Sequence, residues 1–277
     1  MGAHRLASRH VERIWGRRDL VGAFAPPQQA ASEPIGEIWF EDRADAELLV
    51  KYLFTSQRLS IQVHPDDEAA RARGYARGKD EAWYVLSAEP GAVIGLGLTH
   101  DVSRDALRRA ALDGSIEQLL DWRPVQAGDV YFSRAGTVHA IGGGLSLIEI
   151  QQNLDLTYRL YDYGRPRETH LDEGVAVADP APWVQPFEPV STGPRTILAA
   201  GHAFVLERWT ISDGAIATLP EGSVLIPLAA GGAIEGDALE AGTVWAAEGP
   251  VALAGRADLL AAYPGGAALD AILELGA

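Results

Sequence analysis

The sequence predicts a mainly β protein built from two barrels or sandwiches, with a small helical insert in the first. Short apolar or alternating segments such as "LSIQVH", "EAWYVLS", "LSLIEIQ" and "FVLERWTI" recur between Gly, Pro and Asp residues, which is typical of all-β domains. The stretch "DPAPWVQPFEP" from Asp179 carries four prolines and divides the chain. We therefore expect one domain over 1–180 and a second over 181–277.

The helical insert is predicted over about 103–122. The stretch "SRDALRRAALDGSIEQLLDW" contains two runs of helix-forming residues separated by "DG". Ser103 and Ser115 precede the two runs, and serine is a favoured N-cap because its hydroxyl accepts a hydrogen bond from a free backbone N–H group.

Composition restricts the classes of partner. The 277 residues carry a formal net charge of -15, which argues against nucleic acid or an anionic membrane as the partner because the summed field repels both. An anionic small substrate would need a local basic pocket. The absence of cysteine excludes disulfides and thiolate metal sites and is consistent with a reducing compartment. Neither a secretory signal nor an apolar run long enough to span a membrane is recognisable, so we expect a cytoplasmic protein.

The histidines are unevenly distributed, and six of the seven precede the proline-rich boundary. Gln62 and His64 lie two positions apart, so on a strand both side chains point to one face, which in a small barrel can be the interior. Pro65 should end that strand. Glu81 begins the next predicted strand and His139 follows the turn "RAGT". Two imidazoles, a carboxylate and an amide oxygen suit zinc, or less selectively manganese, iron or cobalt, although a Gln-x-His pair taken alone is more often an ordinary polar pair.

The remaining histidines carry no such pattern. His100, His170 and His202 stand alone and are interpreted as surface or structural residues. In the second half "GGAIEGDALEAGTVWAAEGP" has the turn pattern of a metal-binding barrel but no histidine, so a metal-free barrel that supports the first is expected.

Five segments occur in a characteristic order: "GEIWF", "LSIQVHPDDEAA", "GKDEAWYVL", "GTVHAIGGG" and "TYRLYDYGR". Together they resemble the type I mannose-6-phosphate isomerases of the cupin superfamily, in their short bacterial form, from Val11 to Gly174. The resemblance implies two cupin-like jelly-roll barrels and one zinc ion per chain. It implies Gln62, His64, Glu81 and His139 as zinc ligands, and Lys79, Asp155 and Arg159 as catalytic residues.

These residue types suit an aldose-ketose isomerisation of mannose 6-phosphate to fructose 6-phosphate through an enediol. A fixed guanidinium such as Arg159 stabilises the developing oxyanion. Lys79, one of only two lysines beside 21 arginines, or a metal-bound water could transfer the proton, and Asp155 could assist ring opening. The phosphate needs its own cation, for which the candidates are Arg134, Arg165 and Arg167.

Two other functions use the same ligands. A metal-binding cupin could bind sugars without turnover, or an iron-loaded one could act as an oxygenase. Lys79, Asp155 and Arg159 beside a complete ligand set favour the isomerase, because passive binding needs no proton-transfer group.

Overall fold

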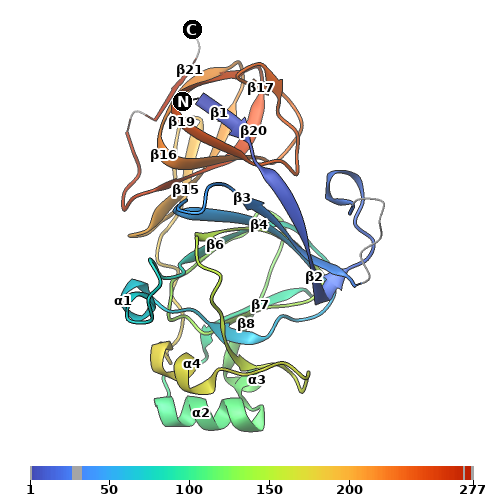
Figure 1. Ribbon diagram of the computed structural model, residues 1–277, viewed down its shortest axis with the longest axis vertical. Coiled ribbons are helices and arrows are strands. Elements are labelled where there is room, and N and C mark those ends of the chain that lie inside the picture. Colours follow the sequence, from blue (N-terminus) through green and yellow to red (C-terminus); the bar gives the residue numbers. More distant parts are fainter. Residues whose placement is uncertain (1, 27–32, 271, 276–277) are drawn as a thin grey trace.

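The computed structural model of the chain describes residues 2–26, 33–270 and 272–275, whose strands form three sheets (Figure 1). The first half holds two of them. The six-stranded sheet has the order β2 (Ala7–Arg17), β3 (Ile35–Glu41), β4 (Leu48–Thr55), β11 (Leu145–Gln152), β6 (Glu81–Ala88) and β9 (Val130–Ser133). The five-stranded sheet has the order β12 (Tyr158–Tyr161), β5 (Ile61–Val63), β10 (His139–Ile141), β7 (Val93–Leu98) and β8 (Leu120–Pro124).

The third sheet belongs almost entirely to the second half. Its main path is β13 (Val190–Thr192), β14 (Arg195–Ala200), β15 (Phe204–Ile211), β20 (Ala257–Pro264), β16 (Ala215–Pro227), β19 (Trp245–Ala254), β17 (Ala233–Ile234) and β18 (Asp237–Ala238). Near the C-terminal end, β21 (Leu273–Leu275) pairs with β16. The first strand of the chain, β1 (Gly2–Arg5), crosses over and pairs with β19 (Figure 1).

The helices form a layer of their own. The described α-helices are α1 (Asp67–Arg71), α2 (Arg104–Asp113), α3 (Ile116–Leu119) and α4 (Leu171–Val177), and a 3₁₀ turn covers Gly22–Phe24. The last three helices lie together at the end of the molecule remote from the second half (Figure 1). Leu107 of α2 and Ile116 of α3 pack in one cluster with Ile61 and Val63 of β5, so the helices cover the outer face of the five-stranded sheet.

The six-stranded sheet is the central layer, buried on both faces. Along β4, Tyr52 and Phe54 belong to the cluster that includes Phe204 and Leu206 of the second half. Leu53, between them, packs with Ile94 of the five-stranded sheet instead. Alternation along the strand therefore joins the two halves on one face and leaves the other face for the interior of the first barrel.

The predicted fold class, mainly β with two cupin-like barrels and a small helical insert in the first half, is confirmed. The Ser103 hydroxyl accepts a hydrogen bond from Ala106 N at 3.1 Å, as an N-cap should, and Gly114 ends α2 in a left-handed conformation. The capping expected of Ser115 is wrong, because its backbone is already helical and its side chain makes no capping bond within the described chain. The insert ends at Leu119, and Leu120 begins β8.

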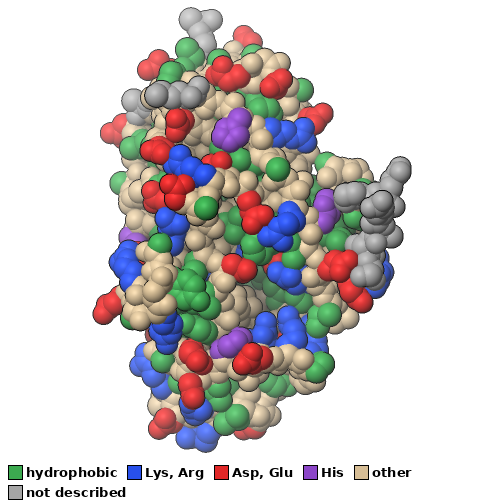
Figure 2. Space-filling view, viewed as in Figure 1, with side chains coloured by type: hydrophobic (Ala, Val, Ile, Leu, Met, Phe, Trp, Pro, Cys, Tyr) green, Lys and Arg blue, Asp and Glu red, His purple; other side chains and the backbone are tan. Residues whose placement is uncertain are grey.

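The surface carries charges of both signs. On the face shown in Figure 2, acidic and basic side chains are interspersed. Several are paired, as in Arg9 with Glu41 at 3.0 Å and Arg208 with Asp258 at 2.7 Å. Among the described residues, no helix is long and apolar enough to cross a membrane.

One buried ion pair should contribute strongly to the stability of the second half. Glu207 is fully buried and accepts hydrogen bonds from Arg195 at 2.7 and 2.8 Å, from Trp209 Nε1 and from the Tyr263 hydroxyl. Arg195 also donates to the carbonyls of Leu269 and Asp270, which fixes the segment before β21.

We expect Glu207→Gln to lower the free energy of unfolding by about 3–5 kcal/mol, because it leaves a buried guanidinium without its counter-charge. Urea denaturation measures the change, and Glu274→Gln, at an exposed position of the same half, is the control, with an expected change within about 0.5 kcal/mol. Equal stability of both variants would contradict the assignment.

Candidate metal centre

The predicted ligands meet where strands of both first-half sheets approach. Gln62 lies on β5 directly opposite His139, the first residue of β10, so the two side chains share a face. His64 follows one residue after the end of β5, which stops at Val63 rather than at Pro65. Glu81 begins β6 in the facing six-stranded sheet. Residues far apart in sequence thereby surround one point in the interior.

The distances are short and the groups are buried. Glu81 Oε1 lies 3.3 Å from His64 Nε2, and Glu81 Oε2 lies 3.6 Å from His139 Nε2. Each of these three side chains is only 1% exposed. One ligand atom from each lies within 4.8 Å of the others, and within the described ranges this is the one group of three or more His, Cys, Asp or Glu residues arranged so closely.

In each imidazole, a hydrogen bond of the Nδ1 nitrogen fixes the orientation of the ring. His64 Nδ1 lies 3.0 Å from the carbonyl oxygen of Leu156, and His139 Nδ1 lies 2.9 Å from that of Thr137. Because a carbonyl only accepts, each Nδ1 carries the proton and each Nε2 presents a lone pair toward Glu81. Burial lowers the pKa of His64 to about 3 and also lowers the pKa of His139. Both rings are therefore neutral near pH 7, which is the form that binds metals.

Glu81 is ionised and lacks hydrogen bonds. Burial alone would raise its pKa, but the adjacent Lys79 ammonium holds it well below the usual range. Neither carboxylate oxygen has a hydrogen-bond partner in the described chain, although both are buried. A buried carboxylate facing two imidazole lone pairs suits a divalent cation such as zinc.

Lys79 and Gln62 lie beside the three buried candidate ligands. Lys79 Nζ lies 3.0 Å from Glu81 Oε1 and 3.4 Å from His64 Nε2. Burial opposes the charge of Lys79, yet Glu81 raises the pKa of the ammonium above its ordinary value. The Gln62 amide nitrogen, 3.3 Å from His139 Nε2, faces the centre. Ligation through the oxygen requires only a half-turn of the amide.

A cavity of about 430 Å³ lies beside the centre. Gln62 and Lys79 line it together with Asp155, Arg159 and Arg167. All three predicted catalytic residues therefore face the same space. Of the arginines considered for the phosphate, Arg167 lines this cavity and is held by Asp162 at 2.6 and 2.7 Å, whereas Arg134 and Arg165 are not among its lining residues.

The Arg159 guanidinium is held by a hydrogen bond, but its Nε donor has no partner among the described residues. One terminal nitrogen donates to the carbonyl of Glu168 at 2.6 Å, while the buried Nε has no partner among the residues described. Burial and the neighbouring Arg167 lower the pKa of the guanidinium, which nevertheless stays charged at neutral pH. A partly free, fixed guanidinium is suited to stabilising a developing negative charge.

Comparison with known proteins supplies an independent finding. The chain is 37% identical over 175 residues to a mannose-6-phosphate isomerase of Streptococcus mutans, covering 60% of this chain and 55% of that protein. The mannose-6-phosphate isomerase of Bacillus subtilis is 35% identical over 179 residues, which cover 61% of this chain and 56% of that one. The chain thus spans little more than half the length of these curated relatives. No family model matches it.

The fold agrees with these sequence matches. A crystal structure of mannose 6-phosphate isomerase from Bacillus subtilis superposes with a TM-score of 0.80 at 26% identity, covering 95% of this chain and all of the other. The chain is related to the mannose-6-phosphate isomerases. Phosphomannose isomerase from Salmonella typhimurium shares the fold, with a TM-score of 0.76 at 14% identity over 96% of this chain and all of the other.

Among the other charged residues that line this cavity, two form a buried pair. Lys51 and Glu149 stand opposite each other on β4 and β11, with Nζ and Oε1 3.2 Å apart. Glu149 also accepts a hydrogen bond from Trp83 Nε1 at 3.1 Å. The signal in the sequence was a lysine inside the apolar strand "LLVKYLFT", where a charge is costly unless it is paired.

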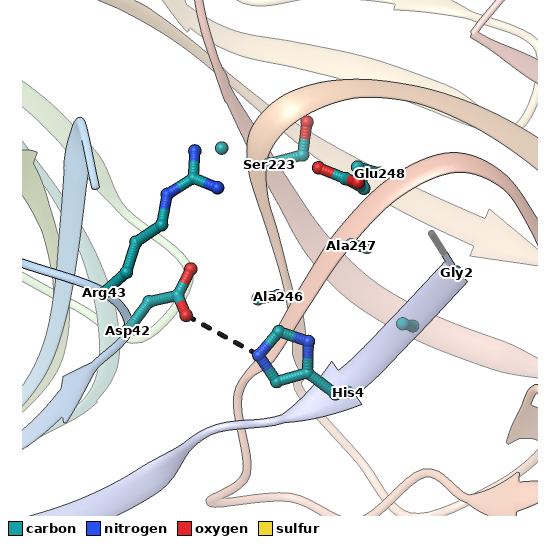
Figure 3. Close-up of a pocket in the computed structure, with 10 residues that line it drawn as sticks. Gly2, His4, Asp42, Arg43, Ser223, Ala246, Ala247 and Glu248 are labelled. Carbon is teal, nitrogen blue, oxygen red and sulfur yellow. Dashed lines mark ion pairs between the residues drawn. The ribbon is translucent and has the colours of Figure 1, made fainter. Parts of the chain in front are cut away.

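A second cavity, of about 420 Å³, lies where β1 meets the β3–β4 turn and the second half (Figure 3). His4 and Asp42 face each other there, with Nε2 and Oδ1 3.5 Å apart. Arg43 beside them is paired with Asp45 and Glu221. This cavity holds one imidazole, and its Arg43 is paired with two carboxylates. Among the described residues it has no buried group of ligands like His64, Glu81 and His139.

Proposed function

We propose that this protein is a zinc-dependent aldose-ketose isomerase that interconverts mannose 6-phosphate and fructose 6-phosphate. The observation that carries the proposal is the buried His64, Glu81 and His139 group, which lies next to a cavity lined by Lys79 and Arg159. The relation to proteins named mannose-6-phosphate isomerase supports the choice of a phosphorylated hexose as substrate.

The proposed ligands are Gln62, His64, Glu81 and His139, whose N and O atoms suit zinc. A bound zinc ion would supply a Lewis acid for a sugar oxygen. Because Glu81 is a zinc ligand in this proposal, the ion would compete with Lys79 for its charge and favour loss of the lysine proton.

The chain's own residues would carry the remaining steps. Lys79 Nζ takes the proton from C2 of the open-chain sugar and returns it to C1, while a second proton passes from the C2 hydroxyl to the C1 oxygen. The Arg159 guanidinium stabilises the negative charge on the oxygen as the enediol forms. Asp155, on the same cavity, assists ring opening. Exclusion of water by the cavity walls strengthens these interactions.

We further propose that residues 1–180 form the metal-binding catalytic domain, that residues 181–277 form a metal-free second domain, and that the protein is cytoplasmic. In support, all four proposed ligands lie between residues 62 and 139. The buried carboxylate of Glu207, in contrast, is already saturated by donors of its own half.

A coupled assay of the purified protein with mannose 6-phosphate tests this function. We expect fructose 6-phosphate formation to fall to background after chelation and to return on addition of zinc, with little turnover of unphosphorylated mannose. Calorimetric binding of the sugar without turnover would indicate a passive binder instead. Oxygen consumption with iron would indicate an oxygenase.

A further inference from the structure

The second half reaches the metal centre through a tight turn between β14 and β15, residues 201–203. Gly201 lies so close to Phe132 of β9 that an added Cβ would be 2.3 Å from the ring, so only glycine fits there without a shift. Phe204, at the start of β15, packs edge-on against the same ring, and the two ring centroids are 5.7 Å apart. These contacts with Phe132 fix the position of the turn against the first half. His202 is the middle residue of this turn.

His202 approaches a buried carboxylate next to the candidate ligands. Asp80 stands between Lys79 and Glu81 and is 1% exposed. Its Oδ2 lies 3.3 Å from His202 Nδ1 and has no hydrogen-bond partner of good geometry in the described chain. The other oxygen, Oδ1, accepts a hydrogen bond from Ala135 N at 2.8 Å.

The Ala135 contact links Asp80 to the backbone of His64 and to the imidazole of His139. Ala135 belongs to the turn 134–137, in which Gly136 N donates to the backbone carbonyl of His64 at 2.9 Å. In the same turn the Thr137 carbonyl accepts the proton of His139 Nδ1 at 2.9 Å. A shift of Asp80 would therefore be passed through this turn to the backbone of His64 and to the carbonyl that orients the His139 imidazole.

We propose that His202 is a positioning residue for the metal centre, acting from the second half through Asp80 on the turn 134–137, which bonds the His64 backbone and orients the His139 imidazole. The inference rests on the proposed function, since it assumes that the centre binds a divalent cation. It gives the second half a specific function, namely maintaining the ligand geometry of the first. His202 touches neither the cation nor the substrate.

Cobalt(II) is the probe, because its visible absorption reports ligand geometry as well as occupancy. Loss of a residue that supports metal ligands typically weakens metal affinity about 10- to 100-fold. Because His202 is largely exposed and acts through Asp80, we expect a smaller effect, with the Kd for cobalt rising about threefold in His202→Ala. The absorption spectrum should change while the melting temperature stays the same.

Two further variants distinguish a positioning role of His202 from the general effect of removing an exposed histidine. His202→Asn, which keeps a donor near Asp80 Oδ2, should restore most of the affinity. His100→Ala removes an exposed histidine of the first half and should bind cobalt as the wild type does. Equal cobalt affinity and spectra for His202→Ala and His100→Ala would overturn the inference while leaving the proposed function intact.

A double-mutant cycle tests whether the effect runs through Asp80. Asp80→Asn keeps an oxygen for Ala135 N but removes the charge beside His202, and its Kd should rise about tenfold. Adding His202→Ala to this variant should weaken binding little further, because the pair is already broken. Fully additive effects would overturn the proposed path. A wild-type protein that binds no cobalt would reject the metal centre itself.

Discussion

Replacing Glu81 by glutamine should abolish stable zinc binding and lower kcat/KM for mannose 6-phosphate by about 10³-fold or more, since a catalytic metal contributes several kcal/mol. Glutamine keeps the shape of the side chain but removes the charge that faces His64 and His139. It also leaves the buried Lys79 ammonium without its partner at 3.0 Å, so the cavity loses an ordered charge pair as well as a ligand.

Metal content after gel filtration and steady-state kinetics measure this effect. Glu68→Gln, which changes an exposed carboxylate of α1, is the control and should retain both zinc and activity. A Glu81→Gln protein that keeps one zinc ion per chain and near-normal turnover would place the functional metal elsewhere.

Replacing Arg159 by alanine should lower kcat and kcat/KM together by about 10²-fold or more, without loss of zinc or of melting temperature. The guanidinium is held by the Glu168 carbonyl and keeps a free buried Nε, so it is oriented before the substrate arrives. Arg159→Lys should recover little activity, because a flexible ammonium does not reproduce the planar donor group.

The kinetic pattern distinguishes the possible roles of Arg159. A loss mainly in KM that shrinks for unphosphorylated mannose would make it a phosphate anchor, and a lower melting temperature would make it structural. Arg109→Ala, at an exposed position of α2, is the control with expected wild-type kinetics. Near-normal kcat for Arg159→Ala would remove this residue from the mechanism.

The strands around the centre could be predicted because each is indicated by a short stretch of neighbouring residues. The two-residue spacing of Gln62 and His64, the strand beginning at Glu81 and the turn before His139 can each be recognised within about ten residues. The candidate ligand set itself came from the resemblance, since spacing alone also allowed an ordinary polar pair. Helices α1 and α4 were not foreseen, because five and seven residues are too few for a clear helical period.

Long-range partners could not be predicted from local patterns. His202 was interpreted as a lone histidine, and its proximity to Asp80 depends on how one glycine turn of the second half packs against Phe132. Lys51 and Glu149 were likewise found opposite each other only once the register of β4 and β11 was known. Such pairs arise from tertiary packing, which no window of sequence contains.

The pairing of β1 with β19 has a consequence for the order in which the chain can fold as it is synthesised. Gly2 pairs with Glu248, so β1 has to wait for a partner that is made 246 residues later (248 − 2). At about 5–20 residues per second, that delay is roughly 10–50 seconds, during which the edge of this strand is exposed to other chains. The sheet of the second half therefore acquires β1 only after β19 has been synthesised.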